Sequence, residues 1–290
     1  MAVQAVQQIR RMRGGAQSQL MLGADGNAWV VKFQNNPQHL RVLANEFLGT
    51  KLGTLLGLPM PNCDVVQVTP WLIDRTSELE MDYGHRQERC RAGLHFGSQM
   101  VGGLMPGHTA DYLPEDQLVG VRNLQEFAGA LVLDKWTCNS NGRQALFHRK
   151  GREKRYSAKF IDQGFCFNAA EWRFEDAPLR GAYGRNVVYR EVTGWESFEP
   201  WLSRVEEMGA QPVWEIAETM PPEWYDGDVE ALERLVEKLI ERRSGVRDLV
   251  TEFRESSREP FPNWNGGNAG AKKRRLEGLE WGDSYQGRVM

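Results

Sequence analysis

The chain has 290 residues, a formal net charge of −3 and 41% apolar residues, which suffices for a buried core in one large domain or two medium ones. No apolar run approaches the roughly 20 residues that a membrane helix needs, so we expect no membrane-spanning helix. The near-neutral charge argues against a general nucleic-acid-binding protein.

The first part of the chain predicts two strands, a helix and a further strand. Residues 18–33 predict a β-hairpin, because SQLML and NAWVVKF are strand-like and the GADG between them supplies turn glycines. Residues 35–57 predict a helix with leucines at helical spacing, capped by Asn35 or Asn36. The next segment, LPMPNCDVVQVTP at 58–70, is typical of a strand.

A polar excursion and a connector follow. Residues 74–92 are polar and charged, and GLHFGSQMVGG at 93–103 is another candidate strand. The segment TADYLPEDQL, at 109–118, is typical of a connector between two parts of a structure.

Helices dominate the second half of the chain and are interrupted by one hairpin. Residues 121–139 are amphipathic and predict a helix. Two strand-like pieces follow at 143–149 and 156–168, joined by a basic turn. From about 195 to 255 the pattern is helical, and Asp228 is the expected N-cap of its clearest helix.

This segregation of strands and helices predicts an α+β fold with two lobes. We expect a strand-rich N-terminal lobe over 1–110, a connector over 111–120 and a helix-rich C-terminal lobe over 121–255. Residues 256–290 are rich in Gly, Asn and charge and lack periodicity, which is typical of a flexible tail. We interpret the AKKRR run in this tail as a solubilising charge run rather than a nucleic-acid site.

The cysteines and the N-terminal sequence bear on the compartment. Cys63, Cys90, Cys138 and Cys166 are far apart and form no CxxC pair, which indicates reduced thiols of a cytoplasmic protein rather than a zinc site or a disulfide framework. The start, MAVQAVQQIRRMRGG, has a basic cluster but no apolar segment with a cleavage site, so it does not predict a signal peptide.

A glycine-containing stretch, RGGAQSQ at 13–19, precedes the first predicted strand. Gly14 and Gly15 let the backbone turn its amides toward an anion, and Ser18 can add a donor. Taken alone, the stretch is better explained as a flexible glycine turn.

Two charged residues lie in apolar surroundings. Lys32, in the strand WVVKF, requires a carboxylate or phosphate partner unless it reaches solvent from an edge strand. Glu46, in LANEFLG, lies near the core side of the predicted helix and can pair with such a lysine. The alternative for Glu46 is a solvated helix residue, which is commoner.

The stretch KFIDQGFCF places Asp162 between apolar residues, where an unpaired carboxylate costs several kcal/mol. The preceding loop gathers four polar residues, Asp134, Asn139, Asn141 and Arg143. Phosphoryl transfer from ATP requires parts in this order: amides over the phosphates, a lysine held by a glutamate, an Asn and an Asp on Mg²⁺, and an Asp that orients the hydroxyl. We therefore predict that Asp162 faces magnesium, with a structural aspartate that caps its own loop as the alternative.

These stretches resemble the HipA-like kinases, and the likeness runs through residues 12–250. The matching segments are MRGGAQSQLM, WVVKFQNNPQHLRVLANEFLGTKLGTLLGLPMP, NLQEFAGALVLDKWTCNSNGRQALF, IDQGFCFN and PPEWYDGDVEALERLVEKLIERRSGVRDLV. The resemblance implies a two-lobed protein-kinase-like fold, related to the HipA toxin kinase and distantly to the phosphatidylinositol kinases, that binds ATP and magnesium. Since the toxin member phosphorylates a protein serine, it also implies a protein serine or threonine, or a small molecule, as the phosphoacceptor.

Carried over by position, the resemblance makes Lys32 the ATP lysine and Glu46 its partner. It makes Asp162 the magnesium aspartate, with Asn139 as the candidate second metal ligand. It also makes the connector at 111–118 the hinge beside the adenine.

The catalytic loop departs from the family pattern, which often reads NADGRQ. Here the stretch is NSNGRQ, so Asn141 stands where the aspartate is expected, and an amide cannot accept a proton as a carboxylate does. Asp134 with Asn139 five residues later is a second possible match, of the form D-x-x-x-x-N, and Arg143 either stabilises phosphate charge or is structural. Both registers stay open at this point, and so does a pseudokinase that binds nucleotide without turnover.

Overall fold

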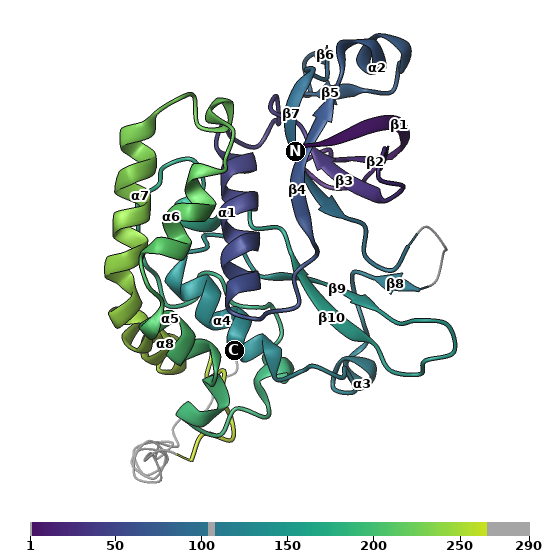
Figure 1. Cartoon of the computed structure of the whole chain (residues 1–290). Helices are drawn as coiled ribbons and strands as arrows, with labels where there is room; N and C mark the ends of the chain where they lie inside the picture. The colour runs from purple at the N-terminus through teal and green to yellow at the C-terminus, as the bar shows by residue number, and fades with distance from the viewer. Residues whose placement is uncertain (1, 104–107, 266–290) are drawn as a thin grey trace, which may run out of the picture.

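Five strands from the first hundred residues close into a barrel (Figure 1). The computed structural model describes residues 2–103 and 108–265. Around the barrel the order is β1-β2-β3-β7-β4, in which β1 runs parallel to β4 and all other neighbours are antiparallel. The five strands are β1 Val3–Arg11, β2 Gln19–Gly23, β3 Ala28–Lys32, β4 Cys63–Val68 and β7 Gly93–Gln99.

The β2–β3 hairpin confirms the prediction for residues 18–33. Gly26 adopts a φ of +79°, which the tight turn between the two strands requires. Gln19 pairs with Val31 in the ladder, and the side chains of Met21 and Val31 are fully buried inside the barrel. The same register places Ser18 opposite Lys32, one residue beyond the last pair of the ladder.

Helix α1, Val42–Leu55, begins later than predicted, and neither predicted cap caps it. The Asn35 side chain donates to the Arg89 carbonyl at 3.0 Å, and the Asn36 side chain accepts from the Gln38 amide at 2.9 Å. These bonds hold the residues before the helix in a loop of turns and bends. Figure 1 shows α1 between the barrel and the other helices, which explains why most of its side chains are buried.

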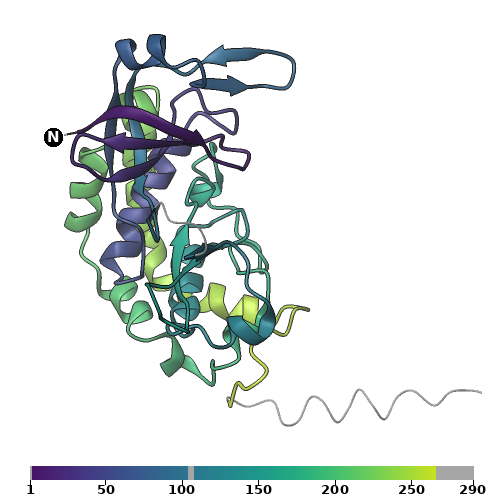
Figure 2. The same ribbon diagram turned by 90° about the vertical axis from the view of Figure 1, so that its right-hand side faces the viewer.

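Four elements of the N-terminal part were not predicted. Strand β1 lacks clear alternation, because Ala5 is its only buried residue. The polar stretch after β4 contains α2, Pro70–Arg75, and the strands β5, Glu80–Asp82, and β6, Gln87–Arg89. Figure 2 shows the β5–β6 hairpin projecting from the barrel, where its polar residues meet solvent.

A second sheet has the order β10-β9-β8 and contains the predicted inserted hairpin. Its strands are β8 Thr109–Ala110, β9 Gln144–His148 and β10 Ser157–Ile161. Because β8 already pairs with β9, the chain passes from the barrel to this sheet between β7 and β8, which is earlier than the predicted connector at 111–120. That connector contains a short helix, α3 Glu115–Leu118.

Helix α4, Glu126–Trp136, has most of its side chains buried. Asp228 caps α7 as predicted, since its carboxylate accepts from the Ala231 amide at 2.9 Å. The other α-helices are α5 Trp201–Glu207, α6 Gln211–Glu218, α7 Val229–Arg242 and α8 Val246–Arg254. Helix α4 packs against α5 and α8, whereas α6 packs against α1 and α7. The 3₁₀ helices are η1 Cys166–Asn168, η2 Asn186–Tyr189, η3 Trp195–Phe198, η4 Pro222–Trp224 and η5 Arg243–Gly245.

The described chain continues beyond residue 255, where the flexible tail was expected to begin. Phe261 is buried and its ring stacks on Trp264, and the Arg258 guanidinium donates to the Asn186 side chain at 2.5 Å. The rest of the predicted tail, 266–290 with its AKKRR run, lies outside the described residues. None of the helices in the described residues is long and apolar enough to cross a membrane.

Candidate functional site

The Lys32 ammonium joins three segments of the chain. It donates to Glu46 Oε1 on α1 and, at 2.8 Å, to Asp162 Oδ1 just after β10, 130 residues away in sequence. The exposed fractions of the three side chains are 10% for Lys32, 3% for Glu46 and 18% for Asp162, so the aspartate has the most contact with solvent. The structure therefore brings together three residues that the sequence singled out separately.

Backbone amides fix Glu46 against the segment after Asp162. Gln163 N donates to Glu46 Oε2 and Gly164 N donates to Glu46 Oε1, both at 3.0 Å. A side chain at position 164 would not fit, because an added Cβ would lie 2.8 Å from Val42 Cγ2 and 3.2 Å from Glu46 Oε1. Gly164 thus permits the close approach of this segment to α1.

The ionisation of the three groups is coupled. Burial works against the charge of Lys32, but the Glu46 and Asp162 carboxylates prevail and raise the pKa of its ammonium. Burial also works against the charge of Asp162, yet the Lys32 ammonium holds its pKa below the usual range. Burial raises the pKa of Glu46, and Lys32 opposes that shift. At neutral pH the site therefore presents a charged lysine beside the Asp162 carboxylate.

Asn45, which the sequence reasoning missed, also holds the segment after Asp162 in place. Its side-chain amide nitrogen lies 2.8–2.9 Å from the carbonyl oxygens of Gly164, Cys166 and Ala169. Its amide oxygen accepts from Trp172 Nε1 at 2.7 Å. In the sequence, Asn45 could have been singled out as a second polar residue, next to Glu46, on the buried side of the predicted helix.

Gln144 is the second residue that the sequence reasoning missed. It opens β9, is exposed, and donates from Nε2 to Asp162 Oδ2 at 2.6 Å. The two oxygens of Asp162 therefore have different neighbours, Lys32 on one side and Gln144 on the other. We call Lys32, Glu46, Asp162 and Gln144 the open cluster.

Three other predicted site residues, Asp134, Asn139 and Arg143, form a separate sealed cluster. The Arg143 guanidinium binds both oxygens of Asp134, through Nε at 2.9 Å and through Nη2, and also donates to the Ile161 carbonyl at 2.9 Å. Asn139 Nδ2 donates to Asp134 Oδ1 at 2.8 Å. The side chains of Asp134 and Arg143 are 0% and 1% exposed, so this carboxylate has no face toward a substrate.

The backbone at Gly181 closes the sealed cluster. Gly181 has a φ of +77°, and a Cβ added there would lie 2.7 Å from Asp134 Cβ. Burial raises the pKa of Asp134, and the Arg143 guanidinium opposes that shift. This cluster braces α4 against β9 and the end of β10.

Asn141 lies exposed in the loop between α4 and β9. Its side-chain oxygen accepts from the amide of the next residue, Gly142, at 2.8 Å, and its own amide donates to Asn139 Oδ1 at 3.1 Å. Asn141 is thus the predicted catalytic-loop residue that faces solvent, in contrast to Asp134.

The glycine stretch lies between β1 and β2. The Asn36 side chain donates to the Ala16 carbonyl at 3.0 Å, and Gly14 adopts a φ of +115°. Within the described residues, no hydrogen bond joins Gly14 or Gly15 to the open cluster, whereas the strand register places Ser18 beside Lys32.

The donor set of the open cluster fits a magnesium ion that is shared with phosphates. Mg²⁺ prefers oxygen ligands and is commonly held by one or two carboxylates together with phosphate oxygens. Asp162 supplies one carboxylate, and no group of three or more His, Cys, Asp or Glu residues suited to a metal occurs among the described residues. The site therefore fits a metal that arrives with a nucleotide better than a metal held by protein ligands alone.

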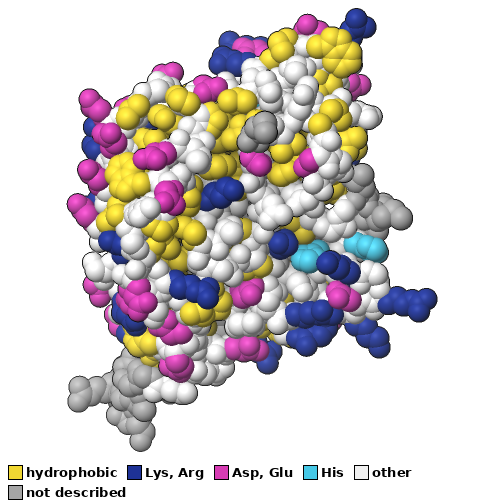
Figure 3. Space-filling model, in the orientation of Figure 1, with side chains coloured by type: hydrophobic (Ala, Val, Ile, Leu, Met, Phe, Trp, Pro, Cys, Tyr) yellow, Lys and Arg dark blue, Asp and Glu magenta, His cyan; other side chains and the backbone are white. Residues whose placement is uncertain are grey.

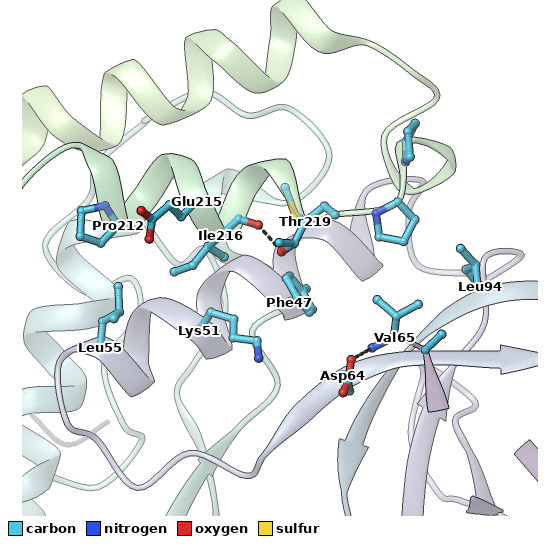
Figure 4. Close-up of a pocket in the computed structure, with 14 residues that line it drawn as sticks. Phe47, Lys51, Leu55, Asp64, Val65, Leu94, Pro212, Glu215, Ile216 and Thr219 are labelled. Carbon is cyan, nitrogen blue, oxygen red and sulfur yellow. Dashed lines mark hydrogen bonds between the residues drawn. The ribbon is translucent and has the colours of Figure 1, made fainter. Parts of the chain in front are cut away.

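A groove of about 750 Å³ lies on another face of α1, between α6 and β4 (Figure 4). Figure 4 shows Phe47, Lys51 and Leu55 of α1 along one wall and Ile216 of α6 opposite them. None of the open-cluster residues lines this groove, so the large cavity and the cluster are separate features.

The turn between β9 and β10 is strongly basic, and Lys and Arg gather on this side of the molecule at the lower right of Figure 3. The turn carries one acid, Glu153, among Arg149, Lys150, Arg152, Lys154 and Arg155. The expectation against nucleic-acid binding rests on the net charge of the whole chain, whereas this turn has a local excess of positive charge. The expectation that the protein does not bind nucleic acid stays a prediction.

Comparison with known families and structures agrees with the resemblance seen in the sequence. Residues 5–143 match the family described as HipA-like kinase. No curated protein matches the sequence at a significant level. The predicted resemblance to the HipA-like kinases is thereby confirmed over this part of the chain.

Solved structures of kinases share the fold. The Helicobacter pylori proinflammatory kinase CtkA matches with a TM-score of 0.55 at 11% identity, over 89% of this chain and 100% of that one. The Golgi casein kinase matches with a TM-score of 0.50 at 12% identity, over 88% and 73%. HipA of Shewanella oneidensis MR-1, solved with HipB and operator DNA, has a TM-score of 0.47 at 12% identity, over 85% and 68%. At these identities the first two matches establish the fold alone, which agrees with the predicted mixture of strands and helices.

Proposed function

We propose that this HipA-like chain binds ATP and magnesium at the open cluster and transfers the γ-phosphoryl group to a hydroxyl acceptor. The observation that carries the proposal is the Lys32 ammonium held between Glu46 and Asp162. The three residues come from three separate segments of the chain. Phosphoryl transfer depends mainly on positioning and on charge stabilisation, and a lysine fixed by a buried glutamate beside a metal-binding aspartate supplies both. The family match and the kinase fold support the same conclusion.

Three residues of the open cluster, Lys32, Glu46 and Asp162, have proposed roles. Lys32 binds phosphate oxygens, and Glu46, fixed by two backbone amides, keeps the ammonium in position. Asp162 holds the metal, which when bound neutralises charge on the phosphates. Gly14, Gly15 and Ser18 are proposed to cover the phosphates, and the segment at 111–118 to lie beside the adenine.

The catalytic loop contains Asn141 at the position where a general base is expected. Its amide can orient an acceptor hydroxyl by a hydrogen bond but cannot take the proton. Asp134 cannot substitute in this arrangement, because its carboxylate is sealed and bound by Arg143. We therefore propose slow turnover, with Arg143 as a structural arginine. A protein serine or threonine is the acceptor that the resemblance implies.

The lack of an accessible carboxylate in the catalytic loop favours a second function, a nucleotide-binding module without turnover. The loop from Asn139 to Arg143 contains no carboxylate, and the nearest one along the chain, Asp134, is inaccessible. General-base catalysis typically contributes about 10²–10⁴-fold to a rate, and without it turnover can fall below a useful level.

Restoring the carboxylate separates the two functions. If Asn141 stands at the base position of a working kinase, Asn141→Asp should raise phosphoryl transfer from γ-labelled ATP by about 10²-fold or more. The double variant Asn141→Asp with Asp162→Ala should abolish that gain. No increase, combined with retained nucleotide binding, would support the binding module.

A thermal-shift measurement tests nucleotide binding itself. A ligand at 100 times its dissociation constant stabilises the native state by about 2.7 kcal/mol, so millimolar ATP with magnesium should raise the melting temperature of the wild type. Asp162→Ala should lose the magnesium-dependent part of the shift. A wild-type protein that shows no shift with ATP or ADP would overturn both functions.

A further inference from the structure

The two oxygens of Asp162 are not equivalent. Oδ1 accepts from the Lys32 ammonium at 2.8 Å, which directs it toward the lysine and Glu46. Oδ2 accepts from Gln144 Nε2 at 2.6 Å, on the side where Asp162 meets solvent. Oδ2, beside Gln144, is therefore the oxygen at which a cation can bind Asp162 without competing with the Lys32 ammonium.

Building on the proposed function, we infer that Gln144, and not Asn139, is the amide that holds the metal together with Asp162. Gln144 provides a neutral oxygen, so it adds a ligand without placing a second negative charge next to Asp162. The amide now donates from Nε2, and a half-turn about its last side-chain bond brings Oε1 to the same side as Asp162 Oδ2.

The sheet fixes Gln144 beside Asp162. Gln144 pairs with Ile161 in the β9–β10 ladder, so the backbone places it directly next to the residue that precedes Asp162. The alternation of β9 buries Ala145 and Phe147 and turns Gln144 away from the core. The contact therefore follows from strand register and does not depend on a flexible loop.

Asn139 cannot serve the same purpose without dismantling the sealed cluster. The residue is 1% exposed, its side-chain nitrogen donates to Asp134 and its side-chain oxygen accepts from the Asn141 backbone amide. Both ends of the amide are thus in use, and freeing either one leaves a buried polar group without a partner. Asn139 is better explained as part of the brace that supports the loop.

The test measures the affinity for Mn²⁺ in the presence of ADP, and binding is detected by electron paramagnetic resonance of the ion. We expect Gln144→Leu to weaken the affinity for Mn²⁺ on the order of tenfold, because it removes the amide oxygen and keeps a similar side-chain size. Gln144→Glu should strengthen it, because a carboxylate is the better ligand for a divalent cation. Binding of ADP in EDTA should not change in Gln144→Leu, since Lys32 and Glu46 are intact.

Gln87→Leu provides a matched control, because Gln87 is also exposed and also opens a short strand, β6, but lies outside the open cluster. Its affinity for Mn²⁺ should equal that of the wild type. If the wild type binds Mn²⁺ and ADP and Gln144→Leu binds Mn²⁺ equally well, the inference about Gln144 is overturned while the proposed function stands. If the wild type binds ADP neither with nor without Mn²⁺, both are overturned.

Discussion

The open and sealed clusters use the same kinds of side chain but differ in their contact with solvent. Each contains a carboxylate bound by a cation and a neutral amide that donates to that carboxylate. In the sealed cluster the Asp134 side chain is 0% exposed, whereas the Asp162 side chain in the open cluster is 18% exposed. The guanidinium of Arg143 occupies both oxygens of Asp134, whereas Lys32 occupies one oxygen of Asp162.

This difference shows that residue type alone does not separate a structural aspartate from a functional one. A buried ion pair contributes little net stability, yet removing one partner is strongly destabilising because the other charge is left uncompensated. Removing one partner of the sealed ion pair should therefore cost more stability than removing one partner in the open cluster. The open cluster has an accessible oxygen at Asp162 that a ligand can use.

The largest expected effect is on folding. We expect Asp134→Ala to lower the free energy of unfolding by about 3–5 kcal/mol, because it leaves the Arg143 guanidinium buried without a counter-charge. Asp162→Ala should lower it by about 1 kcal/mol, because Lys32 keeps Glu46 and the site is partly open to solvent. Urea unfolding of the two variants measures the difference. Equal losses would show that the clusters do not differ as their exposure indicates.

A double-mutant cycle sharpens the comparison. In the sealed cluster we expect Asp134→Leu and Arg143→Met to be coupled by about 2 kcal/mol, since removing both charges spares the cost of leaving one buried. The corresponding cycle with Lys32→Met and Asp162→Leu should give a smaller coupling. In Asp162→Leu, Glu46 still pairs with Lys32, and in the double variant Glu46 is left as an unpaired charge. A larger coupling in the open cluster would contradict this account.

The sequence predicted the centre of the open cluster because buried charges require partners. Lys32 in an apolar strand and Asp162 at the end of another each implied an opposite charge nearby, and Glu46 on the buried side of a helix supplied one. Gln144 gave no such signal, because an exposed glutamine in a strand is ordinary. Its contact with Asp162 depends on the β9–β10 register, which the sequence did not specify.

The sequence could not separate the sealed cluster from the catalytic loop, because Asp and Asn favour a helix-to-strand loop for turn chemistry as well as for catalysis. Only the packing shows that Arg143 and the Gly181 backbone enclose Asp134. Helix α1 was predicted to start too early for a related reason. Asn35 has the right residue type for a helix cap, but its side chain binds the distant Arg89 carbonyl.

The last expected effect concerns acid sensitivity. His95, in β7, is fully buried, accepts from the Gln34 amide at 3.2 Å through Nδ1 and donates from Nε2 to the Arg91 carbonyl at 3.0 Å. Burial lowers the pKa of His95 to about 3, so it stays neutral in the folded protein. The unfolded chain takes up a proton below about pH 6.5, so the stability that depends on neutral His95 is lost as the pH falls from that value.

We expect the free energy of unfolding to fall by about 1.4 kcal/mol between pH 7.5 and 5.5 because of His95 alone, measured by urea unfolding across that range. His95→Gln keeps a donor for the Arg91 carbonyl and should remove this part of the slope, while His39 and His148, whose pKa values burial also lowers, keep a smaller dependence of the same sign. Asp162→Ala should leave the slope unchanged, because the pKa of Asp162 is lowered and lies well below this range. A slope that is lost in Asp162→Ala and kept in His95→Gln would place the titrating group in the open cluster and contradict the charge states assigned to it.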